Sequence, residues 1–129
     1  MTHTNKDVGV SHQIGKYSDA VEVNPGMRWL FTSGTPGLET NGTLPNGISA
    51  QAELAWTHIM RMLTSANMTV SDVVKVTQYL TRAEDIAEYA KVRARFLGNS
   101  EPASMLLVIP QLVRIDFLVE VEVIAAAGI

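Results

Sequence analysis

The alternation of apolar and polar residues is clearest near the end of the chain, where residues 117–125 read Phe-Leu-Val-Glu-Val-Glu-Val-Ile-Ala. Successive side chains of a β-strand point to opposite faces. The pattern therefore predicts a strand with Glu120 and Glu122 on one face and valines on the other. A carboxylate among apolar neighbours costs free energy unless it gains a partner. Three interpretations stay open for this face: a group used in chemistry, a polar seam between subunits, or a partly solvated sheet surface.

Periodicity elsewhere predicts two helices and four further strands. Apolar residues recur every three or four positions over 49–66 and again over 82–97, which is typical of helices that pack on one side. A turn at 24–26 separates two strand-like segments and predicts a hairpin of the first two strands. The polar segment 1–13 is expected to lie loosely against the rest of the chain. The four further strands are predicted at 17–23, 28–33, 73–80 and 101–109.

This order of elements predicts a single α+β domain over residues 1–129, in which both helices cover one face of a mixed β-sheet. Segments 29–31 and 105–109 are apolar on both sides, and continuous apolar strands are typical of sheets that are buried on both faces. Two helices cannot cover both faces. The second face is therefore expected to meet another subunit, which predicts an oligomer.

Composition narrows the classes of function. The chain has 129 residues, a net charge of −3 and no run of Lys or Arg, so no binding of nucleic acid is expected. It has no apolar run of membrane-spanning length, no signal-like N-terminus and no cysteine. These features predict a cytoplasmic protein without disulfides or a cysteine nucleophile. No histidine pair has the spacing of metal ligands and no glycine-rich phosphate loop occurs, so neither a metal nor a nucleotide cofactor is expected.

Short motifs spread over nearly the whole chain match the pattern of one known family. Segment 14–21 is similar to its Gly-Pro-Tyr-Ser-Gln-Ala opening, and segment 31–34 is similar to its Thr-Ser-Gly strand end. Pro102-Ala103 is similar to the first two residues of its Pro-Ala-Arg motif, and segment 119–125 to its closing Glu-Ile-Glu-Ala-Ile-Ala strand. On these residues the chain resembles the reactive-intermediate deaminase (RidA) family, also called the YjgF or endoribonuclease L-PSP family.

The resemblance implies a chorismate-mutase-like α+β fold and a homotrimer whose sheets line a central barrel, with three ligand clefts between subunits. In active members the cleft hydrolyses enamines and imines to a keto acid and ammonia without a cofactor, which implies a small ligand that bears a carboxylate. Carried over by position, the resemblance implies that Glu120 places or activates water and that Tyr17 binds or orients the substrate. It also implies that Ser33 and Gly34 line the pocket.

The chain departs from the family at the residues that grip a carboxylate. Ser104 stands where the arginine of Pro-Ala-Arg is expected, and Leu106 stands where a cysteine is expected two places on. A serine cannot form the charged, two-pronged contact of a guanidinium. Ser104, Leu106 and Arg114 are the candidate ligand-binding residues in this part of the chain. The basic residues that could supply the grip instead are Lys16, Arg28, Arg93 and Arg114.

Three functions are consistent with these patterns. The leading one is a homotrimeric hydrolytic deaminase of a small enamine or imine, for which an aminomuconate-like compound is one candidate substrate. The second is a non-catalytic trimer that binds a small ligand in the same cleft and has lost the family's activity. The third, a ribonuclease, is disfavoured by the acidic charge balance and by the absence of a basic stripe.

Overall fold

The computed structural model describes residues 2–129, and its main feature is a five-stranded mixed sheet. The strand order is β3-β7-β5-β6, and a short strand, β4, also pairs with β7. β5 and β6 run parallel, whereas the other neighbours are antiparallel. The bounds are Arg28–Phe31 for β3, Thr35–Pro36 for β4, Val73–Leu80 for β5, Ala103–Val108 for β6 and Val119–Ala127 for β7.

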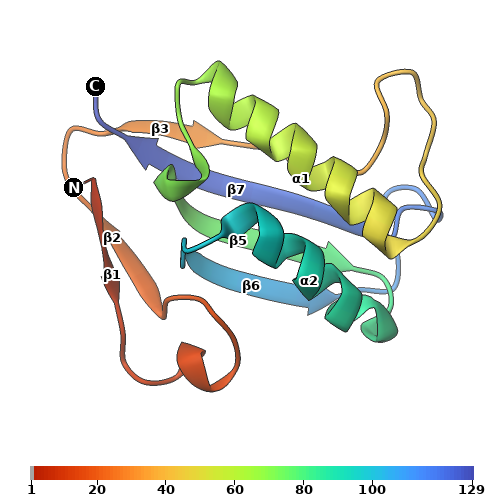
Figure 1. Ribbon diagram of the computed structural model, residues 1–129, viewed down its shortest axis with the longest axis horizontal. Coiled ribbons are helices and arrows are strands. Elements are labelled where there is room, and N and C mark those ends of the chain that lie inside the picture. Colours follow the sequence, from red (N-terminus) through yellow and green to blue (C-terminus); the bar gives the residue numbers. More distant parts are fainter. Residues whose placement is uncertain (1) are drawn as a thin grey trace.

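Two helices, α1 at Ile48–Ser65 and α2 at Ile86–Leu97, pack on the same face of this sheet (Figure 1). The predicted fold class is confirmed, because two helices cover one face of a mixed sheet. No helix within residues 2–129 is long and apolar enough to cross a membrane. Three single 3₁₀ turns complete the helical structure of these residues, at Ser11–Gln13, Val70–Asp72 and Ala83–Asp85.

The core lies between the helices and the sheet, and the alternation of β7 determines which side chains enter it. Val119, Val121 and Val123 are buried beneath the helices together with Trp56 of α1 and Tyr89 of α2. Glu120 and Glu122 are only partly buried and lie on the opposite face, as the period of two predicts. Strand β7 therefore contributes an apolar face to the core and a polar face to the side without helices.

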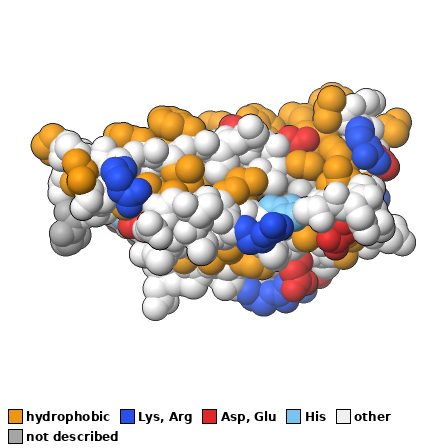
Figure 2. All heavy atoms as spheres, turned by 90° about the horizontal axis from the view of Figure 1, so that it is seen from above, with side chains coloured by type: hydrophobic (Ala, Val, Ile, Leu, Met, Phe, Trp, Pro, Cys, Tyr) orange, Lys and Arg blue, Asp and Glu red, His pale blue; other side chains and the backbone are white. Residues whose placement is uncertain are grey.

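The face without helices, called here the open face, carries large apolar side chains. Trp29 and Phe31 of β3 stack on each other with ring centroids 6.2 Å apart, and they are 50% and 68% exposed. Met105 of β6 is 52% exposed. In Figure 2, hydrophobic side chains gather along the upper edge of the molecule, the side that faces away from the viewer in Figure 1. A single chain leaves this face uncovered, in line with the prediction of a second subunit.

The N-terminal part of the chain corrects two predictions. Within residues 2–13, expected to lie loosely, β1 at His3–Lys6 forms an antiparallel pair with β2 at Ala20–Val23; residue 1 lies outside the described part. The predicted hairpin of the first two strands is wrong, because β3 pairs with β7 instead. The physical reason is burial: Leu30 lies opposite Ala125 of β7 and packs against the core, a gain that a local hairpin with β2 does not offer.

Candidate active site

Glu120 and the strand end that contains Ser33 and Gly34 lie together beside the open face. Glu120 pairs with Pro36 of β4 and with Tyr79 of β5. The chain leaves β3 and passes so close to Glu120 that a Cβ atom added to Gly34 would lie 2.5 Å from Glu120 Oε1. Because Gly34 has no side chain, the Glu120 carboxylate can occupy this space. Glu120, Ser33 and Gly34 are called here the carboxylate half-site.

The surroundings of Glu120 make its carboxylate more basic than an ordinary one. Burial, and then the negative charge of nearby Glu122, raise the pKa of Glu120 above its usual value of 4.5. The Tyr79 hydroxyl donates a hydrogen bond of 3.4 Å to Glu122 Oε1. Burial and the charge of Glu122 also raise the pKa of Tyr79, so this phenol stays protonated and remains a donor at neutral pH.

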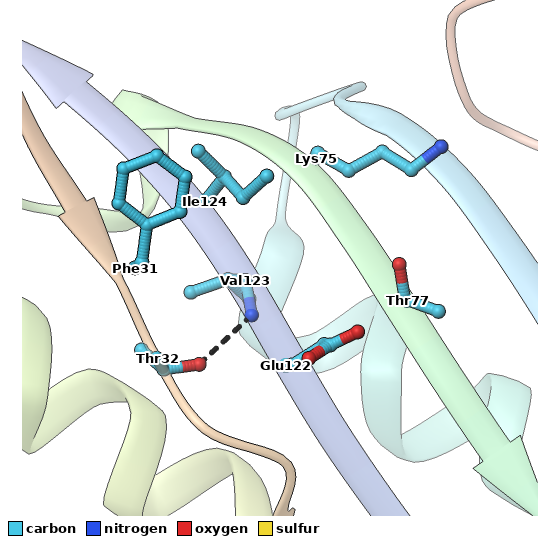
Figure 3. Close-up of a pocket in the computed structure, with 7 residues that line it drawn as sticks. All are labelled: Phe31, Thr32, Lys75, Thr77, Glu122, Val123 and Ile124. Carbon is cyan, nitrogen blue, oxygen red and sulfur yellow. Dashed lines mark hydrogen bonds between the residues drawn. The ribbon is translucent and has the colours of Figure 1, made fainter.

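A small pocket adjoins the half-site on the open face and is shown in Figure 3. Its volume is about 120 Å³, which is the space of roughly four water molecules. The carboxylate of Glu122 points toward Thr77, and the ammonium of Lys75 points away from Glu122 (Figure 3). The pocket combines one acid and one base with a mostly apolar wall. Its lining residues are Phe31, Thr32, Lys75, Thr77, Glu122, Val123 and Ile124.

Thr32 fixes the strand end against β7. Its backbone N–H donates to the Val123 carbonyl at 3.1 Å, and its Oγ1 accepts from the Val123 N–H at 3.0 Å. The second bond is the dashed line in Figure 3. Because Thr32 directly precedes Ser33 and Gly34, these two bonds hold the backbone of the carboxylate half-site in place beside Glu120.

Tyr17 lies elsewhere, beside the first residues of β6. Its neighbour Ser18 forms an isolated parallel bridge with Ala103. The Ser18 N–H donates to the Pro102 carbonyl at 3.2 Å, and the Ser18 hydroxyl donates to the Glu101 carbonyl at 2.5 Å. These contacts place the half-buried Tyr17 at the outer edge of the sheet, next to the segment that leads into Ser104 and Leu106. Tyr17, Ser104 and Leu106 are called here the tyrosine half-site.

Ser104 is held inward by a buried glutamine that the sequence analysis did not single out. Gln78 of β5 is completely buried, and its Nε2 donates to Ser104 Oγ at 3.0 Å and to the Met105 carbonyl at 2.8 Å. Its Oε1 accepts from the Tyr89 hydroxyl and from Arg93 Nη1, both at 2.9 Å. The signal in the sequence was a glutamine on the apolar face of a strand, between Val76 and Leu80.

The structure does not bring the two half-sites together within one chain. Strands β6 and β3 lie at opposite edges of the sheet, and at about 4.8 Å per strand they are roughly 14 Å apart. Ser104 and Leu106 pair with Val76 and Gln78 and face the helices, whereas Glu120 lies on the open face. Within one chain the two half-sites therefore face different directions.

Two of the four basic candidates are occupied elsewhere. Arg114 bonds to both carboxylate oxygens of Asp116, at 3.0 and 3.3 Å, and its guanidinium lies 4.7 Å from the centroid of the Phe117 ring. Arg28 donates to the carbonyls of Ala66 and Gly128, both at 2.9 Å. Of the four, Lys16 and Arg93 lie near the tyrosine half-site. Among residues 2–129 no group of three His, Asp or Glu side chains could hold a metal ion.

Comparisons with known proteins agree with this architecture. Residues 10–127 match the family described as endoribonuclease L-PSP. The chain is 32% identical over 117 residues to the 2-iminobutanoate/2-iminopropanoate deaminase of Bos taurus, covering 89% of this chain and 82% of the relative. The crystal structure of YyfB from Yersinia pestis, a Rid-family protein of unknown function, has a TM-score of 0.85 at 24% identity, over 98% of this chain and 100% of that one.

A second solved structure, Escherichia coli TdcF with bound serine, has a TM-score of 0.74 at 26% identity, over 89% of this chain and 91% of that one. The family match spans both half-sites, from the segment before Tyr17 to the end of β7. The chain therefore belongs to the endoribonuclease L-PSP family, the Rid or YjgF family that its motifs resemble.

Proposed function

We propose that the protein hydrolyses a small enamine or imine to a carbonyl compound and ammonia, at clefts where the half-sites of neighbouring copies meet in a homotrimer. The observation that carries this proposal is the close approach of Glu120 to Gly34. It places a partly buried carboxylate of raised pKa directly beside the chain that leaves β3. The Bos taurus relative, whose name describes the deamination of two imino acids, supports the same reaction class.

The chemistry needs a positioned base and a positioned substrate. The carbon of an imine is already electrophilic, so Glu120 has only to accept a proton from the attacking water while a new C–O bond forms. That proton then passes to the imine nitrogen, which gives a carbinolamine. Glu120 next takes the proton of the new hydroxyl group and delivers it to the amine nitrogen, so that the C–N bond breaks and ammonia leaves as the C=O bond forms. A carboxylate of raised pKa suits both transfers, because it accepts a proton more readily than an ordinary carboxylate does.

Assembly supplies the second half of each cleft. The carboxylate half-site of one copy and the tyrosine half-site of the next would then face each other, with Tyr17 orienting the substrate. The exposed side chains of Trp29, Phe31 and Met105 give the open face the apolar character of a subunit interface. Light scattering should give a mass of three times 14.0 kDa, and a stable monomer would exclude the shared cleft.

One observation favours the non-catalytic alternative. Ser104 accepts its hydrogen bond from the buried Gln78 and lacks the charge that grips a carboxylate. A trimer that binds a small ligand without turning it over would have the same architecture. The two functions differ in what they require of Glu120, since only hydrolysis uses its proton.

The deciding experiment replaces that proton acceptor. Glu120→Gln keeps the shape of the side chain, so the trimer should persist while turnover falls by roughly a hundredfold or more. A suitable substrate is 2-iminobutanoate, formed in situ from threonine by a dehydratase and followed by release of 2-oxobutanoate. Glu122→Gln, on the same face of β7, is the matched control and should lose far less. Turnover that is no faster than in buffer for the wild type would favour the ligand-binding trimer.

A further inference from the structure

A small cavity near the tyrosine half-site is lined by two cations and no acid. It has a volume of about 60 Å³ and lies at the C-terminal end of α2. That volume is the space of roughly two water molecules, so it fits one small charged group and not a whole ring. No carboxylate is among its lining residues, which are Lys16, Ala90, Arg93, Ala94, Leu97, Gly98 and Ser100. It is called here the α2 cavity.

Arg93 keeps most of its hydrogen-bonding capacity free of acidic partners. None of the ion pairs among residues 2–129 involves it, although Arg82, Arg95 and Arg114 each pair with a carboxylate. A guanidinium has five N–H donors, and Arg93 uses one of them toward Gln78 Oε1 at 2.9 Å. The remaining donors can form the two-pronged contact that carboxylates accept.

The surroundings of Arg93 hold it in a fixed position. Gln78 is completely buried and is tied to β6 through Ser104 and Met105, so its carbonyl oxygen is a rigid acceptor. The guanidinium carbon also lies 5.5 Å from the centroid of the buried Tyr89 ring, within reach of a cation–π attraction. A guanidinium ordered before the ligand arrives loses less conformational entropy on binding.

Lys16 strengthens the positive field of the cavity. Its ammonium donates to the Gly98 carbonyl at 2.8 Å, at the end of α2 where the helix dipole favours a cation. This bond accounts for the position of Lys16 without a ligand. The positive charge nevertheless adds to that of Arg93 across a narrow cavity, and no acidic residue lines the cavity to offset it. Tyr17, the next residue in the chain, belongs to the tyrosine half-site.

We propose that the α2 cavity binds the carboxylate of a small organic acid, with Arg93 as the residue that grips it and Lys16 as the second charge. This inference deepens the proposed function and rests on it in one respect: the carboxylate is that of the substrate of the same cleft. In this proposal the charged contact with the carboxylate comes from Arg93 of α2, which Gln78 holds in place. Gln78 also bonds to Ser104, which carries no charge of its own.

The test is a titration of the intact protein followed by NMR, with sodium 2-oxobutanoate, its uncharged amide and inorganic phosphate as probes. We expect 2-oxobutanoate to shift the backbone amides of Ala90, Ala94 and Gly98, and the amide probe to leave them unchanged. Arg93→Met should weaken binding of the acid by about tenfold to a hundredfold. Arg95→Met, two residues on in α2 and paired with Glu53 on the surface, should bind like the wild type.

Arg93→Lys keeps the charge but loses the fork, so it should bind between the wild type and Arg93→Met, and it tests the proposal if the methionine variant does not fold. Equal binding by the wild type and the Arg93 variants would overturn the proposal. The absence of binding by the wild type at about 20 mM would also overturn it, because that concentration nearly saturates a site with a Kd of about 1 mM. Phosphate binding as tight as that of the acid would overturn the assigned ligand class.

The two proposals fail in distinguishable ways. If Glu120→Gln abolishes turnover while Arg93→Met leaves both KM and binding unchanged, the hydrolytic function stands and the carboxylate grip is elsewhere. If binding of 2-oxobutanoate depends on Arg93 but no imine is hydrolysed, the α2 cavity stands and the catalytic function is wrong.

Discussion

Replacing Gly34 with alanine tests whether the position of the Glu120 carboxylate matters. The added Cβ would lie 2.5 Å from Glu120 Oε1 and 3.7 Å from its Cδ, whereas ordinary contacts of a Cβ begin near 3.4 Å. The carboxylate must therefore withdraw by about 0.9 Å, a shift that follows from van der Waals contact distances. Gly34 does not have a positive φ, so alanine fits the backbone and the steric conflict is confined to this one side chain.

The structure sets the size of both effects. The atom that must move is the end of a flexible side chain, so the free energy of unfolding should change by less than about 1 kcal/mol. A displacement of about 1 Å in a catalytic group costs on the order of a hundredfold in rate, and turnover should fall by that amount. Because burial is the main cause of the raised pKa of Glu120, a carboxylate pushed toward solvent should titrate closer to its usual value of 4.5.

Three measurements check this prediction: thermal unfolding, release of keto acid from the imine, and the pKa of Glu120 from carboxyl ¹³C shifts. Gly128→Ala is the control, because a Cβ there meets nothing within 4 Å. If Gly34→Ala keeps full turnover and an unchanged Glu120 pKa, the contact between the strand end and the carboxylate has no role in the chemistry. If it unfolds, the position is structural.

Three further predictions concern stability and assembly. Gly37→Ala should lower the free energy of unfolding by about 1–3 kcal/mol, because the new Cβ would overlap the backbone carbonyl of Gln51 in α1; an unchanged urea midpoint would contradict this. Phe31→Asp should reduce the mass seen by light scattering without loss of helical circular dichroism, since Phe31 is exposed in the single chain. The pKa of Glu120 is higher in the folded protein, so the wild type loses stability as pH rises from 4.5 through the raised pKa. Glu120→Gln lacks this loss and should become more stable relative to the wild type over that pH range, but not below it; a stability difference between the two proteins that does not change with pH would refute the sign.

Local patterns in the sequence predicted those elements whose side chains alternate or recur on one face. The strand at 73–80 was predicted with the bounds that β5 has, and the helix at 49–66 differs from α1 by one residue at each end. The prediction of a hairpin was wrong because the pairing of β3 is decided by a strand far away in the chain, β7. Leu30 gains a buried neighbour at Ala125, and no local signal reports that gain.

The same distinction applies to the candidate site. Motifs could propose Ser33, Gly34 and Glu120 because each lies in a short recognisable segment, and the structure places these segments side by side. Motifs could not reveal that Ser104 faces the helices, because that depends on its register against Val76 of β5. They also could not rank Arg93 above Arg114, since the difference lies in which arginine already has a carboxylate partner.

Glu120 would connect the candidate site to the proposed assembly. Within one chain the carboxylate is already partly desolvated, and this costs stability at neutral pH that no nearby cation offsets, since no ion pair among the described residues includes it. A partner that covers the open face would remove more water and raise the pKa of Glu120 further. One contact would then have two effects: it would bury the rings of Trp29 and Phe31, and it would raise the pKa of the carboxylate that the proposed hydrolysis uses.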